Sequence, residues 1–544
     1  MTTQRTPNRI VAAFALAFGA ATMAATPAHA RDQAPLRTLV YCSVTNPNGF
    51  QPALYTDEPT FEASSRTIFD RLVAFNDDAS RLVPSLAESW DISADGLRYT
   101  FHLRRGVRFQ SNFGFRPTRD FNADDVLFTF DRMRLPSHPY HAVSGGTYTY
   151  FKSMGLGRLI RAIDKVDPYT VRFTLAEPNA PFLSDMAMDF ASIDSAEYGE
   201  MLLRAHRPED FDRKPVGTGS FMLKSYQPGS EVRYEAFQEA WRGRPAIDRL
   251  VFAITPDASV RWSRLRAGEC QAMNYPAPTD LPAMRADPAV RVVSAPGMNE
   301  VYIGLNLERA PLGDARVRRA LALAIDKRAI VDAVFRGDAV VAHTPLPPGM
   351  PAAAAQVDQT PFDPAQARRL LREAGYPKGF DTDVWAVGVG QGLVRDPRRI
   401  AVMIQADWAA IGVRARVVTY EWGEYLRRLG NGEHGTALVA WGSDNGDPDN
   451  FIGALLSCSG VHTTQNISEY CRHDFDALLD HARASHDAPT RLRLYRQAQA
   501  RFQADLPFIP LAHVNQTAVI SRRVQGFVAN PFGIRSFDRV RLVD

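Results

Sequence analysis

Residues 85–110 read SLAESWDISADGLRYTFHLRRGVRFQ and predict a turn followed by a β-strand. The residues at 93–96, Ser-Ala-Asp-Gly, are of the types that favour turns. Tyr99, Phe101 and Leu103 then alternate with polar side chains. Because successive side chains of a strand point to opposite faces, this alternation is typical of a half-buried strand.

Strand and helix patterns alternate along the rest of the chain. A second period-two run, Val171, Phe173 and Leu175, follows the turn at Asp167-Pro168. Apolar residues at helical spacing predict helices at about 314–325, 364–374 and 399–411. We expect an α/β protein, and the 544 residues, undivided by a Pro/Gly/Ser-rich linker, predict two or three lobes rather than one core.

The first 30 residues have the pattern of an export signal. Arg5 and Arg9 precede a weakly apolar run at 10–25, and Ala28-His29-Ala30 matches a small-x-small cleavage site. No cysteine follows directly, so we expect no lipid anchor, and no later stretch approaches the roughly 20 apolar residues of a membrane span. The prediction is a periplasmic protein cleaved after Ala30.

Composition and motifs argue against several functions. Lys and Arg number 63 and Asp and Glu 60, a net charge of +3 without a basic run, so no nucleic-acid partner is expected. HExxH, GxxxxGK[ST] and GxSxG are absent. Residues 388–392, Gly-Val-Gly-Gln-Gly, break the GxGxxG spacing, and His138 and His141 lack a third metal ligand nearby. We therefore expect no enzyme, no metal and no cofactor.

The chain has four cysteines, and all of them follow the predicted cleavage site: Cys42, Cys270, Cys458 and Cys471. An even number in an exported protein predicts two disulfides, and three pairings are possible. A metal site is the alternative, but the cysteines lack CxxC or clustered Cys/His spacing.

Several segments resemble the periplasmic peptide-binding proteins of ABC importers, bacterial extracellular solute-binding family 5. The segments that carry this resemblance are residues 85–133, PVGTGSF at 215–221 and DARVRRALALAID at 314–326. Others are similar to the dipeptide-binding branch of that family: LVYCS at 39–43, YHAVSGG at 140–146, DMAMDFASI at 185–193, FAITPDASVR at 252–261, MIQADWA at 403–409, VTYEWGEYL at 418–426 and SDNGDPDNF at 443–451.

The resemblance implies a two-lobed clamshell of mixed sheets flanked by helices, as in periplasmic binding proteins. One lobe would comprise residues 31–68, 217–295 and 514–544, with an inserted domain at 69–216, and the other lobe residues 296–513. The family's disulfide pattern implies the pairs Cys42–Cys270 and Cys458–Cys471.

The resemblance also implies how a peptide would be held. In the family, an Asp after a Trp-x-x pattern binds the ligand ammonium, and here Trp441-Gly442-Ser443-Asp444 makes Asp444 the amino-end anchor. The alternative is that Asp444, Asn445 and Asp447 only build a turn, since Asp-Asn-Gly-Asp-Pro is rich in turn residues.

The opposite end departs from the family pattern. Dipeptide binders hold the ligand carboxylate with an Arg after the Trp that matches Trp385, and that register places Gln391 there. Gln donates a hydrogen bond but cannot neutralise a carboxylate. Arg395 is a substitute if the loop bends; otherwise the ligand is longer, amidated or not a dipeptide.

Three further residues complete the predicted site. Trp422 and Trp441 are candidates for an aromatic wall that accepts varied side chains, with core packing as the alternative. Thr56 matches a threonine that faces the cleft in the family.

The function that follows is a monomeric periplasmic receptor that delivers dipeptides or short peptides to an ABC permease of the inner membrane. The alternatives are another solute (glutathione-like, opine-like or haem) or a role as a chemoreceptor partner. An extracytoplasmic hydrolase would need a nucleophile with its base, or a metal, and no motif offers either.

Overall fold

A computed structural model describes residues 36–350, 352–353, 360–388 and 392–543. The predicted export signal at 1–30 and the predicted anchor Gln391 lie outside these residues. Residues Arg37–Asp544 form one compact unit. None of the helices in the described residues is both long and apolar enough to cross a membrane.

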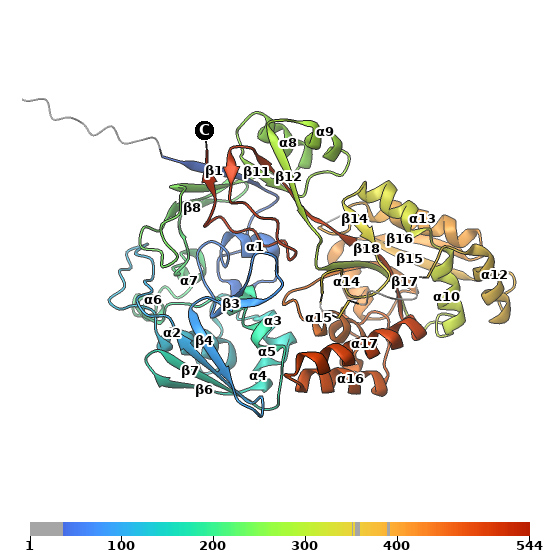
Figure 1. Cartoon of the computed structure of the whole chain (residues 1–544), viewed down its shortest axis with the longest axis horizontal. Helices are drawn as coiled ribbons and strands as arrows, with labels where there is room; N and C mark the ends of the chain where they lie inside the picture. Colours follow the sequence, from blue (N-terminus) through green and yellow to red (C-terminus); the bar gives the residue numbers. More distant parts are fainter. Residues whose placement is uncertain (1–35, 351, 354–359, 389–391, 544) are drawn as a thin grey trace, which may run out of the picture. The chain divides into compact units, whose positions relative to one another are not determined.

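A seven-stranded mixed sheet gathers segments from both ends and the middle of the chain (Figure 1). β1 pairs in parallel with β10 and β11, and the other pairs are antiparallel. In spatial order the strands are β12 (Val290–Ala295), β19 (Gln516–Ser521), β11 (Ala272–Asn274), β1 (Thr38–Ser43), β10 (Arg249–Ile254), β9 (Glu231–Ala236) and β8 (Phe221–Gln227). In the sequence, α1 (Glu58–Ala63) follows β1, α8 (Ala258–Arg266) lies between β10 and β11, and α9 (Leu281–Ala286) lies between β11 and β12.

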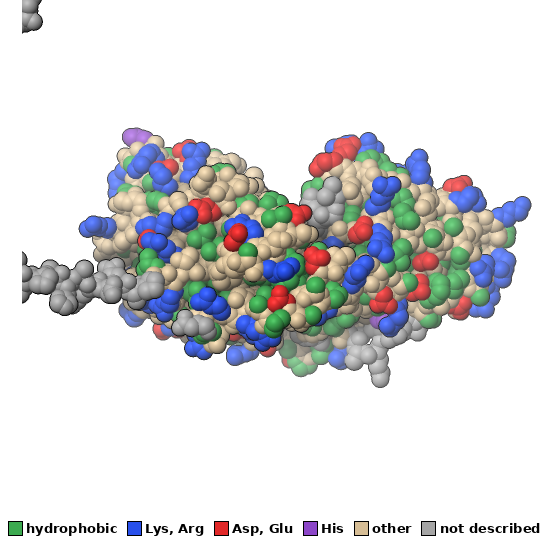
Figure 2. Space-filling model, turned by 90° about the horizontal axis from the view of Figure 1, so that it is seen from above, with side chains coloured by type: hydrophobic (Ala, Val, Ile, Leu, Met, Phe, Trp, Pro, Cys, Tyr) green, Lys and Arg blue, Asp and Glu red, His purple; other side chains and the backbone are tan. Residues whose placement is uncertain are grey.

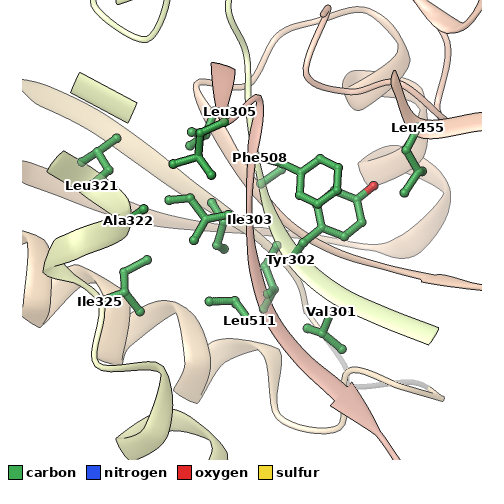
Figure 3. Packing of buried hydrophobic residues seen from close by; sticks show 14 of the residues in the cluster. Val301, Tyr302, Ile303, Leu305, Leu321, Ala322, Ile325, Leu455, Phe508 and Leu511 are labelled. Carbon is green, nitrogen blue, oxygen red and sulfur yellow. The ribbon is translucent and has the colours of Figure 1, made fainter. Parts of the chain in front are cut away.

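A six-stranded mixed sheet carries the largest hydrophobic core. In spatial order its strands are β14 (Ala339–Val341), β18 (Phe508–Val514), β13 (Asn299–Leu305), β17 (Thr436–Gly442), β15 (Asp381–Val387) and β16 (Arg414–Tyr420). Every residue of β13 is buried, and the core around it includes residues of several helices as well as of the neighbouring strands. Figure 3 shows Tyr302 of β13 beside Phe508 of β18, with ring centroids 4.4 Å apart.

Helices are observed at the three places where the spacing of apolar residues predicts them. The three predicted helices are observed as α10 (Ala315–Ala324), α12 (Pro364–Glu373) and α13 (Pro397–Ala409). Asp314 caps α10 by accepting a hydrogen bond from the Arg316 N–H at 2.8 Å. The others are α11 (Lys327–Ile330), α14 (Trp422–Gly430), α15 (Asp449–Leu456), α16 (His473–Ala484) and α17 (Ala488–Asp505).

The two sequence stretches with period-two alternation form neighbouring strands of a four-stranded antiparallel sheet. Its order is β4 (Ala87–Ile92), β5 (Arg98–Leu103), β7 (Thr170–Leu175) and β6 (Ile160–Asp167). Tyr99, Phe101 and Leu103 of β5 are all buried, as the alternation predicts. The helices of this region are α2 (Ala123–Arg134), α3 (Thr149–Ser153), α4 (Leu156–Leu159), α5 (Phe182–Asp185), α6 (Ala196–Arg204) and α7 (Asp210–Arg213), with a 3₁₀ turn, η3 (Asp189–Ala191).

The chain passes between the seven- and six-stranded sheets along two short connectors. β12 leads through 296–298 into β13, and β18 leads through Asn515 into β19. Two further strand pairs, β2 (Val73–Phe75) with β3 (Leu82–Pro84) and β20 (Val524–Gln525) with β21 (Arg541–Leu542), complete the described strands. The predicted α/β class with mixed sheets is confirmed, whereas the predicted lobe boundaries stay a prediction.

Both disulfides join the cysteines that the resemblance implies, Cys42 with Cys270 and Cys458 with Cys471.

On the face shown in Figure 2, basic and acidic side chains are interspersed rather than segregated into patches of one sign.

Candidate functional site

A cavity of about 760 Å³ lies between two groups of segments that are far apart in the sequence. One wall comes from α1 and the residues around it, α3 and η3, and includes Thr56, Glu58, Arg66, Tyr150 and Asp189. The facing wall comes from the end of β17 with the turn after it, and from residues of the loop that the Cys458–Cys471 disulfide closes.

Asp444 lies two residues after the end of β17 and contributes a carboxylate to this cavity. The Tyr150 hydroxyl donates a hydrogen bond to its Oδ1 at 2.8 Å. The Asp444 backbone N–H donates a hydrogen bond to Asn450 Oδ1 at 3.1 Å, and this bond holds Asp444 in position within the turn. Partial withdrawal from water raises the pKa of Asp444 to about 6, with Asp189 adding to the rise. Among the described residues, no Lys, Arg or His forms an ion pair with Asp444.

The neighbouring acids of the same turn have cation partners. Asp447 accepts two hydrogen bonds from Arg491 Nη2, both at 2.8 Å. Arg483 Nε donates to both oxygens of Asp449, at 2.9 and 3.0 Å. Asp447 thus has the structural role that the alternative interpretation gave to Asp444, Asn445 and Asp447 together. The Asp444 side chain, in contrast, faces the cavity.

Asn445 belongs to the turn and also reaches across the molecule. Its Oδ1 accepts a hydrogen bond from the Asp447 N–H at 3.0 Å, a local contact typical of turns. Its Nδ2 donates to Asp185 Oδ1 at the end of α5, at 2.7 Å. Burial, despite the Asn445 hydrogen bond, raises the pKa of Asp185 well above its ordinary value.

Three charged residues of the cavity, Glu58, Arg66 and Asp189, were not predicted from the sequence. Arg66 Nη2 donates to Asp189 Oδ2 at 3.1 Å, and Arg66 Nη1 lies 4.0 Å from Glu58 Oε1. Arg71 Nη1 also contacts Asp189, at 3.4 Å. Burial pushes the pKa of Asp189 upward, but the two guanidiniums outweigh it and hold that pKa below its ordinary value. Arg66 and Asp189 are 123 residues apart, and no local motif links them.

The other predicted site residues divide into two groups. Trp441, Gly442, Ser443 and Thr56 line the cavity together with Asp444. Trp441 is half-buried, and its Nε1 donates to Asn450 Oδ1 at 3.3 Å. Their ligand contacts stay a prediction.

Trp422 and Arg395 lie elsewhere. Trp422 is 45% exposed and stacks on Tyr425, with ring centroids 6.2 Å apart, outside the described lining of the cavity. Arg395 Nη1 contacts Asp338 Oδ2 at 2.9 Å and donates to the Pro276 carbonyl at 3.1 Å. Arg395 therefore joins the loop before α13 to the residues after β11, and its guanidinium already has an anionic partner.

One grouping of metal-ligand residue types occurs in the described part of the chain, at Cys458, His473 and Asp476. Cys458 is bonded to Cys471, so its sulfur is not available as a thiolate ligand. The Asp476 carboxylate instead accepts hydrogen bonds from the Cys458 N–H, both at 3.2 Å.

A protein-family model described as bacterial extracellular solute-binding proteins, family 5 Middle, matches residues 81–463. The chain belongs to this family. Members are solute-binding proteins rather than enzymes, in agreement with the missing catalytic motifs. The family-5 assignment also confirms the resemblance found in the sequence.

Individual relatives extend over almost the whole chain. The dipeptide-binding protein of Escherichia coli K12 is 46% identical over 506 residues, 93% of this chain and 95% of the relative. Heme-binding protein A of Haemophilus influenzae KW20 is 45% identical over 500 residues, 92% and 91% of the two chains. The structure of HbpA2 from Haemophilus parasuis superposes with a TM-score of 0.87 at 45% identity, covering 93% of this chain and 100% of that one.

Proposed function

We propose that the protein is the periplasmic substrate-binding subunit of an ABC importer, and that it captures dipeptides or short peptides by their free amino end. The supporting observation is Asp444, a cavity carboxylate without a cation partner among the described residues. A peptide ammonium supplies that missing charge. The 46% identity to a dipeptide-binding protein supports the same ligand class.

The physical argument rests on desolvation. An ammonium that leaves water for a cavity loses several kcal/mol of hydration unless a charged, hydrogen-bonding partner replaces it. Asp444 Oδ1 is oriented by the Tyr150 hydroxyl, so the carboxylate is already positioned to accept from the ligand. No step of bond making or breaking is involved, and delivery to the membrane permease completes the cycle.

Contacts between the two cavity walls support a mechanism in which the two proposed lobes close on the ligand. Tyr150 and Asp185 lie in the proposed inserted domain at 69–216, and their partners Asp444 and Asn445 lie in the proposed lobe at 296–513. Arg395 makes a third bridge, to Pro276 of the first lobe. Contacts that exist only when the walls meet allow a ligand between them to shift the lobes toward the closed arrangement.

The proposal is tested by titrating alanyl-alanine amide and its N-acetylated form into the purified protein in a calorimeter. Acetylation removes the ammonium and should weaken binding by at least about tenfold, because a charged hydrogen bond contributes about 1.5–3 kcal/mol. Equal affinities, or no binding of either compound, would refute capture by the amino end. Mass spectrometry of small molecules that co-purify gives an independent identification.

Haem is the second candidate, favoured by the 45% identity to a heme-binding protein. The charges of the cavity weigh against it, since haem propionates are anionic and Glu58, Asp189 and Asp444 all line the described part. An absorbance titration with haem decides the point. A saturable shift of the Soret band that a short peptide competes away would assign haem to this cavity.

A further inference from the structure

The charged side chains that line the described part of the cavity are unbalanced. Three are acidic, Glu58, Asp189 and Asp444, and one is basic, Arg66. Arg66 is held between two of those acids, at 3.1 Å from Asp189 and 4.0 Å from Glu58. Its charge is therefore already compensated inside the protein.

The cations immediately behind the wall are compensated as well. Arg71 contacts Asp189 at 3.4 Å. Arg535 Nη1 contacts Glu58 Oε1 at 2.5 Å and also pairs with the buried carboxylate of Glu62. If Arg535 turned toward a ligand, the buried Glu62 carboxylate would lose its cation. If Arg71 turned, Asp189 would lose one of its two guanidinium partners, and both losses are costly.

The polar groups that remain uncommitted are neutral apart from Asp444. Thr464 and Gln465 project from the loop closed by the Cys458–Cys471 disulfide, and Gln516 comes from β19. Within the described structure, none of these three side chains makes a hydrogen bond to the protein. They offer hydroxyl and amide groups that suit peptide carbonyls and N–H groups.

From this charge distribution we infer that the cavity selects peptides with a free amino end and no free carboxylate inside it, namely amidated peptides or longer peptides whose acid end lies beyond the cavity. The inference rests on the proposed function and narrows its ligand class. A carboxylate in the cavity meets excess negative charge and finds no cation without an acid partner among the described lining residues. A carboxamide meets neutral hydrogen-bonding groups instead.

The test compares alanyl-alanine with alanyl-alanine amide by calorimetry at pH 7. The amide should bind at least about tenfold more tightly to the wild-type protein, which corresponds to about 1.4 kcal/mol. Equal binding, or tighter binding of the free acid, would overturn the inference while leaving the proposed function standing. Failure of both peptides to bind would refute the proposed function, and this inference with it.

Two variants probe the cause. Asp189→Asn releases Arg66 from its main acid partner, so the preference for the amide should fall by about tenfold or reverse. Asp194→Asn is the matched control: it removes a buried acid that pairs with Arg132 and does not line the described cavity, and the preference should not change. A folded Asp189→Asn protein with the wild-type preference would contradict the role given to Arg66.

A third variant covers the case in which Asp189→Asn does not fold. Gln465→Arg adds a cation beside the neutral lining residues Thr464 and Gln516, at a half-buried position. Within the described structure, the Gln465 side chain makes no hydrogen bond to the protein that the substitution would remove. The preference should then shift toward the free acid by about tenfold. An unshifted preference in this variant would also count against the inference.

Discussion

Asp444 and Asp447 lie in one short turn, yet the protein treats the two carboxylates in opposite ways. Asp447 is 5% exposed and paired with Arg491 of α17, whereas Asp444 faces the cavity and, among the described residues, has only Tyr150 and Asn450 as hydrogen-bond partners. Asp449 follows Asp447, with Arg483 of α16 as its partner. The difference shows that a motif rich in turn residues can have ion-paired acids at one end and, at the other, an acid without a cation partner among the described residues.

The partners explain why the two ends differ. Arg483 belongs to α16 and Arg491 to α17, and neither helix contributes a residue to the described lining of the cavity. Among the described lining residues of the cavity, the one cation is Arg66, and it is paired with Asp189. Stability and ligand binding should therefore respond to different substitutions within the six residues 444–449.

The largest expected effect is on stability at the structural end. Asp447→Asn leaves the Arg491 guanidinium without its carboxylate in a mostly buried site, and should lower the free energy of unfolding by about 3 kcal/mol. Urea unfolding measures it. Asp480→Asn is the control, because Asp480 is 68% exposed beside Arg483 and its loss should change stability by at most about 1 kcal/mol. Similar losses of stability in the two variants would contradict the structural role given to the Asp447–Arg491 ion pair.

A comparable but slightly smaller loss is expected at the loop that forms the same cavity wall as Asp444. Replacing Cys458 and Cys471 by Ala opens a link across 13 residues and should cost about 3 kcal/mol or less in the free energy of unfolding. Because Thr464 and Gln465 of this loop line the cavity, peptide affinity should fall too. Retained affinity in the folded double variant would remove the loop from the site.

A smaller effect is expected from pH on the peptide affinity, through the protonation of Asp444. The pKa of Asp444 is raised to about 6 in the free protein, and a ligand ammonium favours the ionised form, so the pKa falls on binding. Affinity for amino-bearing peptides should be constant from pH 7.5 to 6.5. Below pH 6 it should decrease by up to about tenfold per unit, or 1.4 kcal/mol, because binding must then release a proton.

Calorimetry at pH 7, 6 and 5 measures this dependence. Asp444→Asn serves as the control, since an amide does not titrate and the slope between pH 6 and 5 should disappear. A slope that persists in the variant would mean that another group governs it.

Much of the fold was predictable because its signals are local. The alternation of Tyr99, Phe101 and Leu103 is set by a strand with one buried face, and Asp314 caps its helix within two residues. The cysteine count indicated two disulfides, while the choice of pairs came from family resemblance. Asp444 likewise was recognised by resemblance, since turn chemistry alone favoured a structural role.

The unpredicted parts depend on contacts between distant segments. Arg66 meets Asp189 across 123 residues, and Arg395 meets Pro276 across 119, so neither pairing leaves a pattern along the chain. Trp422 shows the same limit in another form. An aromatic residue in a family motif predicts burial or ligand contact, but its 45% exposure is set by how α14 lies on its sheet.

The most direct test of the central claim is the affinity of Asp444→Asn for a peptide with a free amino end, measured by calorimetry beside Asp447→Asn. Asp444→Asn should bind more weakly than wild type by at least about 1.5–3 kcal/mol, the contribution of a charged hydrogen bond, while its free energy of unfolding is not reduced. Asp447→Asn should show the reverse, lower stability with nearly unchanged affinity while folded. Unchanged affinity in a folded Asp444→Asn protein would contradict the assignment of Asp444 as the ligand's amino-end anchor.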